Sequence, residues 1–158
     1  MKRKVLMIAK GLEKTGVSKV ILSYIDNINK EIFSIDVLTG NSYAMDYRQY
    51  IENKGNKFYE VADRDRNSLK YIFTIARIVK NEKYEIVHVH GNSAMILPEL
   101  LGAWLGGCKV RIAHSHNTTC NHLILDKICR PLFRRLYTVG LACGKEAGRW
   151  MFCNEPFI

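Results

Sequence analysis

Apolar residues along this chain follow two different patterns of spacing. Six short apolar runs, four closed by glycine or charged residues and two by histidines, are typical of buried β-strands. These runs cover residues 5–9, 33–38, 57–61, 86–89, 110–113 and 139–143. Between them, apolar residues recur every three to four positions, which is the spacing of one face of a helix. Helices are predicted at residues 17–28, 47–53, 68–79, 93–105 and 121–137, and a short one follows Lys145.

The regular alternation of strands and helices predicts the fold class. Parallel strands need long crossover connections, usually helices, so the pattern indicates an α/β domain with a Rossmann-like, three-layer arrangement. We expect a mostly parallel sheet of about six strands with helices on both faces, formed by residues 1–158 as one domain. Local signals predict helix starts at Asn67-Ser68, Ser93 and Pro98, whereas Pro131 is expected to interrupt or restart the fifth helix.

Composition excludes several classes of protein. The chain is 47% hydrophobic and 25% charged, and none of its apolar stretches reaches the ~18 residues of a membrane-spanning helix. The basic N-terminus is followed by a short apolar run, Val5 to Ala9, which we interpret as a first strand and not as a signal peptide. Five cysteines without a Cys-x-x-Cys pair indicate reduced thiols in a cytoplasmic protein, used mainly for packing.

The net charge of +9 suits an anionic partner. Part of this charge gathers in the predicted helix at 121–137, where it is carried by Lys127, Arg130, Arg134 and Arg135. Basic residues mixed with leucine and phenylalanine suit an anionic membrane surface, and a charged face over a core-packed helix is the alternative. The aromatic residues are dispersed and no RNA-binding signature occurs, so we expect no nucleic-acid partner.

Histidines mark the ends of two neighbouring predicted strands. His88 and His90 lie two residues apart, as do His114 and His116, so each pair lies on one face of its strand. Polar groups at the carboxyl edge of a parallel sheet are where open α/β folds bind ligands. Two His-x-His pairs could bind a divalent metal, but no aspartate or glutamate lies beside either pair, so no metal ligand is predicted. The alternatives are a base or electrophilic partner for a substrate oxygen and, above all for His88, a structural role.

The turn between the first strand and the first helix is a second candidate site. It reads Lys10-Gly-Leu-Glu-Lys-Thr-Gly-Val-Ser18, and free N–H groups at a helix start attract phosphate. Its glycines match neither the Gly-x-Gly-x-x-Gly nor the Walker spacing. A glycine beside a helix cap, without any ligand, explains the turn equally well.

Several segments, taken in order, resemble a known family. They are Lys4-Val-Leu-Met-Ile followed by Thr15-Gly-Val-Ser-Lys-Val, Tyr84-Glu-Ile-Val-His-Val-His-Gly, Arg111-Ile-Ala-His-Ser-His-Asn-Thr, and Gly140-Leu-Ala-Cys-Gly-Lys-Glu-Ala-Gly148. Their order and spacing resemble the N-terminal half of retaining GT-B glycosyltransferases, a large family that includes phosphatidylinositol mannosyltransferases. The last two segments are most similar to the capsular and exopolysaccharide branch from Gram-positive bacteria.

The resemblance implies roles for individual residues. Thr15 and Gly16 would approach the diphosphate of a nucleotide-sugar donor, with Thr15 in place of the family's first glycine. His114 is implied as the catalytic residue, in contact with the transferring sugar. The acceptor side is implied to be formed by His90, Gly91, Asn92, His116 and Asn117.

The resemblance also implies partners. The donor substrate is a nucleotide-diphosphate sugar, no resident cofactor is needed, and the acceptor is a saccharide, expected to be lipid-linked, at the inner face of the plasma membrane. Nothing matches the family's C-terminal donor-binding domain and the chain ends in Phe157-Ile158, so we expect a truncated chain that is inactive alone. Two other interpretations stay open: a metal-dependent hydrolase that uses the His-x-His pairs, and a non-enzymatic module that binds a membrane or a partner.

Overall fold

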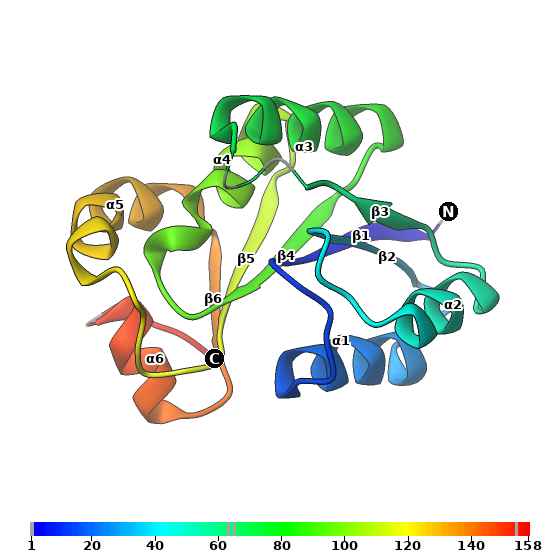
Figure 1. Cartoon of the computed structure of the whole chain (residues 1–158), viewed down its shortest axis with the longest axis horizontal. Coiled ribbons are helices and arrows are strands. Elements are labelled where there is room, and N and C mark those ends of the chain that lie inside the picture. The colour runs from blue at the N-terminus through cyan, green and yellow to red at the C-terminus, as the bar shows by residue number, and fades with distance from the viewer. Residues whose placement is uncertain (1, 63, 65, 154) are drawn as a thin grey trace.

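The computed structural model describes residues 2–62, 64, 66–153 and 155–158. Its centre is a six-stranded sheet in the order β3-β2-β1-β4-β5-β6, and the neighbouring strands are parallel (Figure 1). The strands are β1 (Arg3–Ala9), β2 (Phe33–Thr39), β3 (Phe58–Glu60), β4 (Ile86–Gly91), β5 (Val110–Ser115) and β6 (Val139–Ala142). The chain starts in the middle of the sheet, builds outward to β3, and returns past β1 to continue with β4. This topology confirms the predicted Rossmann-like α/β fold.

Helices cover both faces of the sheet. They are α1 (Gly16–Asn27), α2 (Met45–Asn53), α3 (Ser68–Glu82), α4 (Leu97–Leu105), α5 (Leu123–Leu136) and α6 (Lys145–Phe152), and a 3-10 turn, η1 (Ala94–Ile96), precedes α4. Helices α3 and α4 lie on one face, and α1 and α2 lie on the opposite face (Figure 1). In the part of the chain that the structure describes, none of the helices has the length and apolar character needed to cross a membrane.

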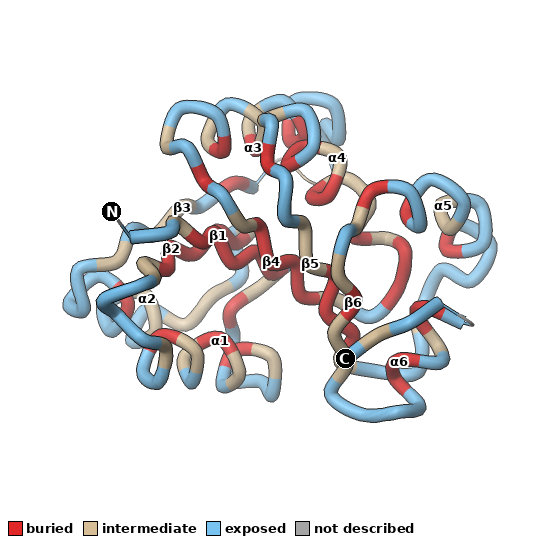
Figure 2. The backbone as a smooth tube through the Cα atoms, turned by 180° about the vertical axis from the view of Figure 1, so that it is seen from behind, coloured by how far each residue is buried: buried red, intermediate tan, exposed pale blue. Residues whose placement is uncertain are grey.

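Alternate residues of the central strands enter two separate hydrophobic cores. Leu6 and Ile8 of β1 pack in the core on the α3 and α4 side, whereas Val5, Met7 and Ala9 pack in the core on the α1 side. Figure 2 shows the buried positions concentrated along the strands and on the inner turns of the helices. This period of two is what a strand covered on both faces requires.

Helix starts follow the predicted local signals. Asn67 Oδ1 accepts a hydrogen bond from Lys70 N at 3.0 Å and caps α3. Ser93 Oγ accepts one from Met95 N at 3.3 Å, so it caps η1, the turn that leads into α4. Pro98 lies in the first turn of α4, where its missing N–H costs no helical hydrogen bond.

Helix α5 continues through Pro131, so the predicted break at this residue is wrong. Proline removes one backbone hydrogen bond inside a helix. Phe133 and Leu136, which follow it, are buried in the core on the α4 side and hold the second half of the helix in line. Tertiary packing here outweighs the local preference.

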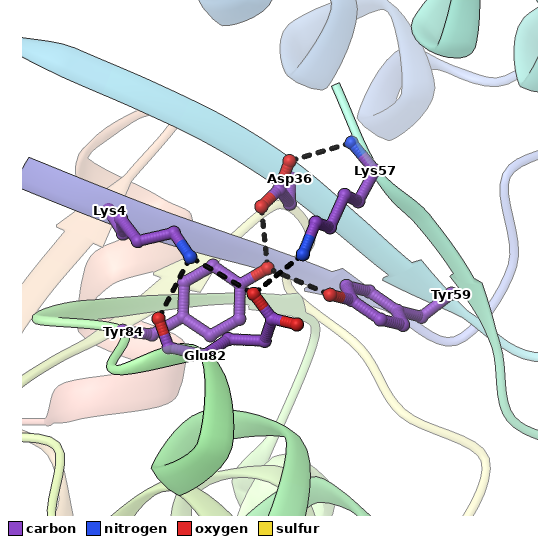
Figure 3. A network of polar contacts seen from close by, with 6 residues as sticks. All are labelled: Lys4, Asp36, Lys57, Tyr59, Glu82 and Tyr84. Carbon is purple, nitrogen blue, oxygen red and sulfur yellow. Dashed lines mark hydrogen bonds and ion pairs between the residues drawn. The ribbon is translucent and has the colours of Figure 1, made fainter. Parts of the chain in front are cut away.

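A buried polar network joins β2, β3 and the segment before β4 (Figure 3). Asp36 accepts hydrogen bonds from Lys57 N at 2.7 Å and from the Tyr84 hydroxyl at 2.6 Å. Burial, together with the Asp36 carboxylate, raises the pKa of the Tyr84 phenol, which therefore stays protonated and donates. Glu82 forms ion pairs with both Lys4 and Lys57 beside this network. These groups satisfy one another, so we interpret the network as structural.

Candidate functional site

Four histidines form a stack on one face of β4 and β5. In the parallel register of these strands His90 lies beside His114, and the alternation of side chains places His88 and His116 on the same face. The ring centroids of His88 and His90 are 4.2 Å apart, as are those of His114 and His116. Across the strands, the His88 and His114 centroids are 5.2 Å apart, and those of His90 and His116 are 5.1 Å apart. The two predicted pairs thus meet in one cluster, the histidine stack (His88, His90, His114 and His116).

The strands that carry the stack are longer than the apolar runs predict. β4 reaches Gly91 and β5 reaches Ser115, so the predicted strand ends at residues 89 and 113 are wrong. His90 and His114 therefore lie within the strand ladder, where the backbone of each neighbour fixes their position. The two strands continue past the apolar runs because the imidazole rings bury one another on the sheet. A hydropathy pattern along one strand cannot detect this contact.

Hydrogen bonds pair the rings of the stack and extend it to a thiol. His88 Nε2 lies 3.1 Å from His114 Nδ1, and His90 Nδ1 lies 2.9 Å from His116 Nε2. Cys143 follows β6, and its Sγ lies 3.0 Å from His116 Nδ1 and 3.7 Å from His114 Nε2. Sequence reasoning assigned the cysteines to packing and missed this contact. The available signal was the position of Cys143 at the end of a predicted strand, which is where the histidines also occur.

The stack is buried and uncharged at neutral pH. His88, His90 and His114 expose only 3%, 3% and 6% of their surfaces. Burial, reinforced by the neighbouring imidazoles, lowers the pKa of His88 to about 3 and that of His114 to about 4. Burial also lowers the pKa of His90 far below its usual value and lowers that of His116. Each ring therefore carries one N–H group and one acceptor nitrogen at pH 7.

A pocket of about 370 Å³ opens at the carboxyl ends of the same strands, on the side of η1 and α4. Its lining brings together four of the five residues implied to bind an acceptor: His90, Gly91, Asn92 and Asn117. The fifth, His116, does not line the pocket, and neither does His114. Both belong to the histidine stack. The candidate site therefore has two parts, a pocket and a histidine stack, which share β4 and β5.

Glu99, a buried carboxylate that sequence reasoning missed, lies in the pocket wall. Its Oε1 atom accepts hydrogen bonds from Arg64 Nε at 2.6 Å and from the Tyr71 hydroxyl at 3.1 Å. Arg64 also donates to the Met95 carbonyl at 2.6 Å. Within the described residues, Glu99 Oε2 is a buried atom without a hydrogen-bond partner. Leaving a buried carboxylate oxygen unpaired is costly. Because this atom is almost fully shielded, a ligand in the pocket would reach it only after the surrounding side chains move.

Thr15 and Gly16 begin α1, at the same edge of the sheet. The Thr15 side chain caps the helix by accepting a hydrogen bond from Ser18 N at 3.5 Å. A Cβ atom at Gly16 would meet no atom within 4 Å, so the space beside this turn is open. Neither residue lines the pocket. Their contact with a donor diphosphate stays a prediction.

The basic residues of α5 divide into two groups. Arg130 turns inward: its Nε lies 2.7 Å from the buried Asp126 carboxylate, and it donates to two backbone carbonyls of α6 at 3.2 and 3.1 Å. It therefore holds α5 against α6, a structural role that composition did not predict. The exposed basic residues are Lys127, Arg134 and Arg135. Exposed apolar side chains lie beside them at helical spacing, at Ile124, Ile128 and Leu132.

Comparison with known proteins assigns this domain to a family. The family model described as Glycosyltransferase Family 4 matches residues 14–143. A protein of Bacillus subtilis (strain 168) named "Putative glycosyltransferase EpsF" is 28% identical over 160 residues, an alignment that covers 95% of this chain and 41% of the relative. The chain thus spans about two fifths of the length of this relative.

Solved structures show the same fold at low sequence identity. MurG from Acinetobacter baumannii matches with a TM-score of 0.67 at 16% identity, covering 92% of this chain and 42% of that protein. A UDP-GlcNAc 2-epimerase from Neisseria meningitidis, bound to UDP-GlcNAc, matches with a TM-score of 0.64 at 17% identity, covering 92% and 41%. The lipopolysaccharide outer core galactosyltransferase WaaB matches with a TM-score of 0.65 at 12% identity, covering 93% and 41%.

These similarities agree with the observed topology. The six-stranded parallel sheet is that of the N-terminal domain in GT-B glycosyltransferases. The family match favours a transferase over the metal-dependent hydrolase and over the non-enzymatic module. Because that match covers most of the chain, including β4, β5 and the histidine stack, the chain belongs to Glycosyltransferase Family 4.

Proposed function

We propose that this chain is the acceptor-binding half of a retaining glycosyltransferase. The whole protein would move a sugar from a nucleotide-diphosphate donor to a saccharide, expected to be lipid-linked, in the synthesis of a capsular or extracellular polysaccharide. The observation that carries the proposal is the pocket lined by the amides of Asn92, Asn117 and Asn121, placed at the carboxyl edge of a Family 4 domain. Binding of UDP-GlcNAc by a protein of the same fold supports a nucleotide-sugar donor.

The chemistry of the pocket suits a saccharide. Its volume of about 370 Å³ falls within the range of about 300–1,000 Å³ that is usual for small-molecule sites. Sugar hydroxyls can exchange hydrogen bonds with the amides of Asn92, Asn117 and Asn121, which line the pocket. Arg64 fixes the Glu99 carboxylate and so holds this part of the pocket wall in one place.

The reaction steps follow from position and charge. In this proposal the turn at Thr15 and Gly16 stabilises the donor diphosphate as it leaves, while a second domain holds the rest of the donor. The Gly16 N–H at the start of α1 would donate to the phosphate, because the Thr15 N–H already donates to Glu13 O at 2.7 Å. The His114 ring is neutral at pH 7 because burial lowers its pKa to about 4, so it orients a sugar hydroxyl by hydrogen bonding and carries no charge. Positioning supplies the remainder of the rate enhancement, and no resident cofactor takes part.

A membrane surface fits the proposed lipid-linked acceptor. The apolar residues Ile124, Ile128 and Leu132 share α5 with the cations Lys127, Arg134 and Arg135. An amphipathic helix of this kind binds anionic lipid through buried apolar area and through charge. We propose that the protein is cytoplasmic and contacts the inner face of the plasma membrane through this part of α5.

His114→Asn, made in a longer protein that contains these residues, tests the reaction. The asparagine amide replaces Nδ1 and keeps the hydrogen bond to His88, but it removes the nitrogen that faces the open edge. With a panel of UDP-sugars and GDP-sugars and a bacterial lipid extract as acceptor, we expect kcat to fall about 100-fold or more. The midpoint of urea unfolding should change little. An unchanged kcat would remove His114 from the mechanism, and absence of transfer from every donor would contradict the proposed function.

Liposome flotation tests the membrane contact with this chain itself. Vesicles with anionic lipid should carry the chain upward, and Arg134→Glu with Arg135→Glu should abolish flotation. Lys19→Glu with Lys30→Glu is the matched control, since these exposed cations lie far along the sequence from α5 and the net charge change is the same. Equal loss in both double variants would show that only net charge matters.

A further inference from the structure

We propose that His114, His116 and Cys143 bind one thiophilic divalent metal ion, zinc in particular, at the carboxyl edge of β5 and β6. This site lies outside the proposed acceptor pocket but shares His114 with the proposed reaction, so a bound ion would occupy the Nε2 atom that otherwise meets a sugar hydroxyl. Metal binding itself does not require sugar transfer. It departs from the sequence-based expectation of no metal. That expectation rested on the missing carboxylate beside each His-x-His pair, and the structure supplies a cysteine sulfur in its place.

The three ligand atoms already have suitable separations. Zinc binds nitrogen at about 2.0–2.1 Å and sulfur at about 2.3 Å, so tetrahedral angles place a nitrogen and a sulfur ligand about 3.5 Å apart. Cys143 Sγ lies 3.0 Å from His116 Nδ1 and 3.7 Å from His114 Nε2. All three atoms lie within 4.8 Å of one another. Shifts of a few tenths of an ångström would therefore bring the sulfur and each nitrogen to the separation that zinc requires.

The remaining nitrogen of each ligating ring has a partner of its own. With Nε2 on the metal, His114 carries its proton on Nδ1 and donates to His88 Nε2 at 3.1 Å. With Nδ1 on the metal, His116 carries its proton on Nε2 and donates to His90 Nδ1 at 2.9 Å. Metal-ligating histidines almost always have such a second partner, which fixes both the tautomer and the orientation of the ring.

This arrangement accounts for the buried half of the histidine stack. His88 and His90 contribute no ligand atom in the proposal, but they accept the protons of the two ligating rings. Once His90 accepts at Nδ1, its own proton lies on Nε2, the buried atom that has no partner among the described residues. The structure tolerates this unpaired group, and fixing both ligating tautomers is a function that explains its presence.

Access distinguishes this site from the other possible set of ligands. His88, His90 and His114 also bring their nitrogens together, but all three are buried. Cys143 is exposed and His116 is partly exposed, so an ion can reach the proposed ligands from solvent. Three protein ligands leave a fourth position open for water or for a substrate oxygen.

Binding requires one bond exchange and no redox change. The thiol S–H bond of Cys143 breaks, its electron pair forms the metal–sulfur bond, and the proton leaves to solvent. Both histidines bind as neutral rings and release nothing. The ion keeps its 2+ charge, and the site gains one positive charge overall.

Cobalt binding to the 158-residue chain tests the proposal without any assay of activity. After dialysis against EDTA, Co²⁺ alone should bind at one equivalent and produce a thiolate-to-cobalt absorption band with visible bands of tetrahedral intensity. One equivalent of Zn²⁺ should remove these bands. In Cys143→Ser the thiolate band should disappear, and the zinc dissociation constant should rise at least tenfold. Since Cys143 is exposed, this variant should keep the wild-type circular dichroism spectrum.

Cys120→Ser is the control: Cys120 lies two residues before a histidine, His122, but is not among the proposed ligands, so this variant should bind metal as the wild type does. His90→Phe removes the acceptor for His116 Nε2–H and should weaken zinc binding about 10–100-fold. Failure to bind one equivalent, or unchanged affinity and spectra in Cys143→Ser, would overturn the metal site. Neither result would affect the proposed function, which is tested by transfer in the longer protein.

Discussion

Acid should destabilise this domain well above the pH at which carboxylates titrate, and the histidine stack is the reason. An unfolded histidine has a pKa near 6.5. In the folded chain, burial and the neighbouring rings lower the pKa of His88 to about 3 and that of His114 to about 4. Between pH 6.5 and about 4 the unfolded state therefore binds protons that the folded state excludes. The free energy of unfolding must fall as pH falls through this window.

The size of the loss in unfolding free energy follows from the unfolded and folded pKa values of each histidine. Between pH 7 and pH 5, an unfolded pKa near 6.5 and a folded pKa of about 3 give a loss of about 2 kcal/mol for His88. His114 gives about the same loss, because its folded pKa of about 4 also lies below this range. His90 and His116, whose pKa values are also lowered, act in the same direction. Two rings alone remove about 4 kcal/mol, a large part of the 5–15 kcal/mol typical of a domain.

Urea unfolding at pH 7 and at pH 5, followed by circular dichroism in EDTA, measures this loss. In His88→Gln the amide replaces Nε2 and can still contact His114, while one titrating ring is removed. The loss between the two pH values should then be about 2 kcal/mol smaller than in the wild type. His122→Gln, at an exposed position, should keep the wild-type loss. A free energy that is flat from pH 7 to pH 5, or an equal loss in His88→Gln, would refute the reasoning.

Two further predictions concern packing. Tyr84→Phe leaves Asp36 without its phenol donor and should lower the free energy of unfolding by about 1–3 kcal/mol in urea titrations at pH 7. A loss below 0.5 kcal/mol, within the range of ordinary surface changes, would contradict this role. Gly102→Ala places a Cβ atom 2.8 Å from Ile75 Cβ and should cost about 1–3 kcal/mol. Gly16→Ala, which meets no atom within 4 Å, should be neutral or stabilising by up to about 1 kcal/mol, and equal costs for the two alanines would contradict the packing argument.

Periodicity predicted the elements well and their ends less well. The apolar runs identified the strands because the central strands are covered on both faces and must be apolar over most of their length. The same rule ended two strands too early, at residues 89 and 113, because His90 and His114 interrupt the apolar run. Their rings bury one another across the β4–β5 pair. Such mutual burial depends on two strands being neighbours, which hydropathy along one strand cannot reveal.

Contacts between distant segments explain what sequence reasoning missed at the site. Cys143 contacts a histidine 27 residues away along the chain, and no motif spacing signals that contact. Glu99 lies in the predicted helix at 93–105 with no local signal that marks it, yet Arg64 and Tyr71 hold it in the pocket wall. Arg130 is different: Asp126 lies four residues before it, and this i,i+4 pair of opposite charges was a readable sign of a local ion pair.

The two parts of the candidate site are held by one backbone ladder. Just past the end of β5, His116 N donates to the O atom of Gly91, the last residue of β4, at 3.1 Å. Just past the end of β6, Cys143 N donates to the O atom of Ser115, the last residue of β5, at 3.0 Å. The polar residues are thus fixed by continued strand pairing rather than by mobile loops, which keeps their geometry before any ligand arrives. Because side chains alternate along a strand, the pocket opens toward α4 while His88 contacts Tyr24 of α1 on the opposite face. A change in the pocket, such as one at Glu99, should therefore leave the spectrum of a metal bound at Cys143 unaltered.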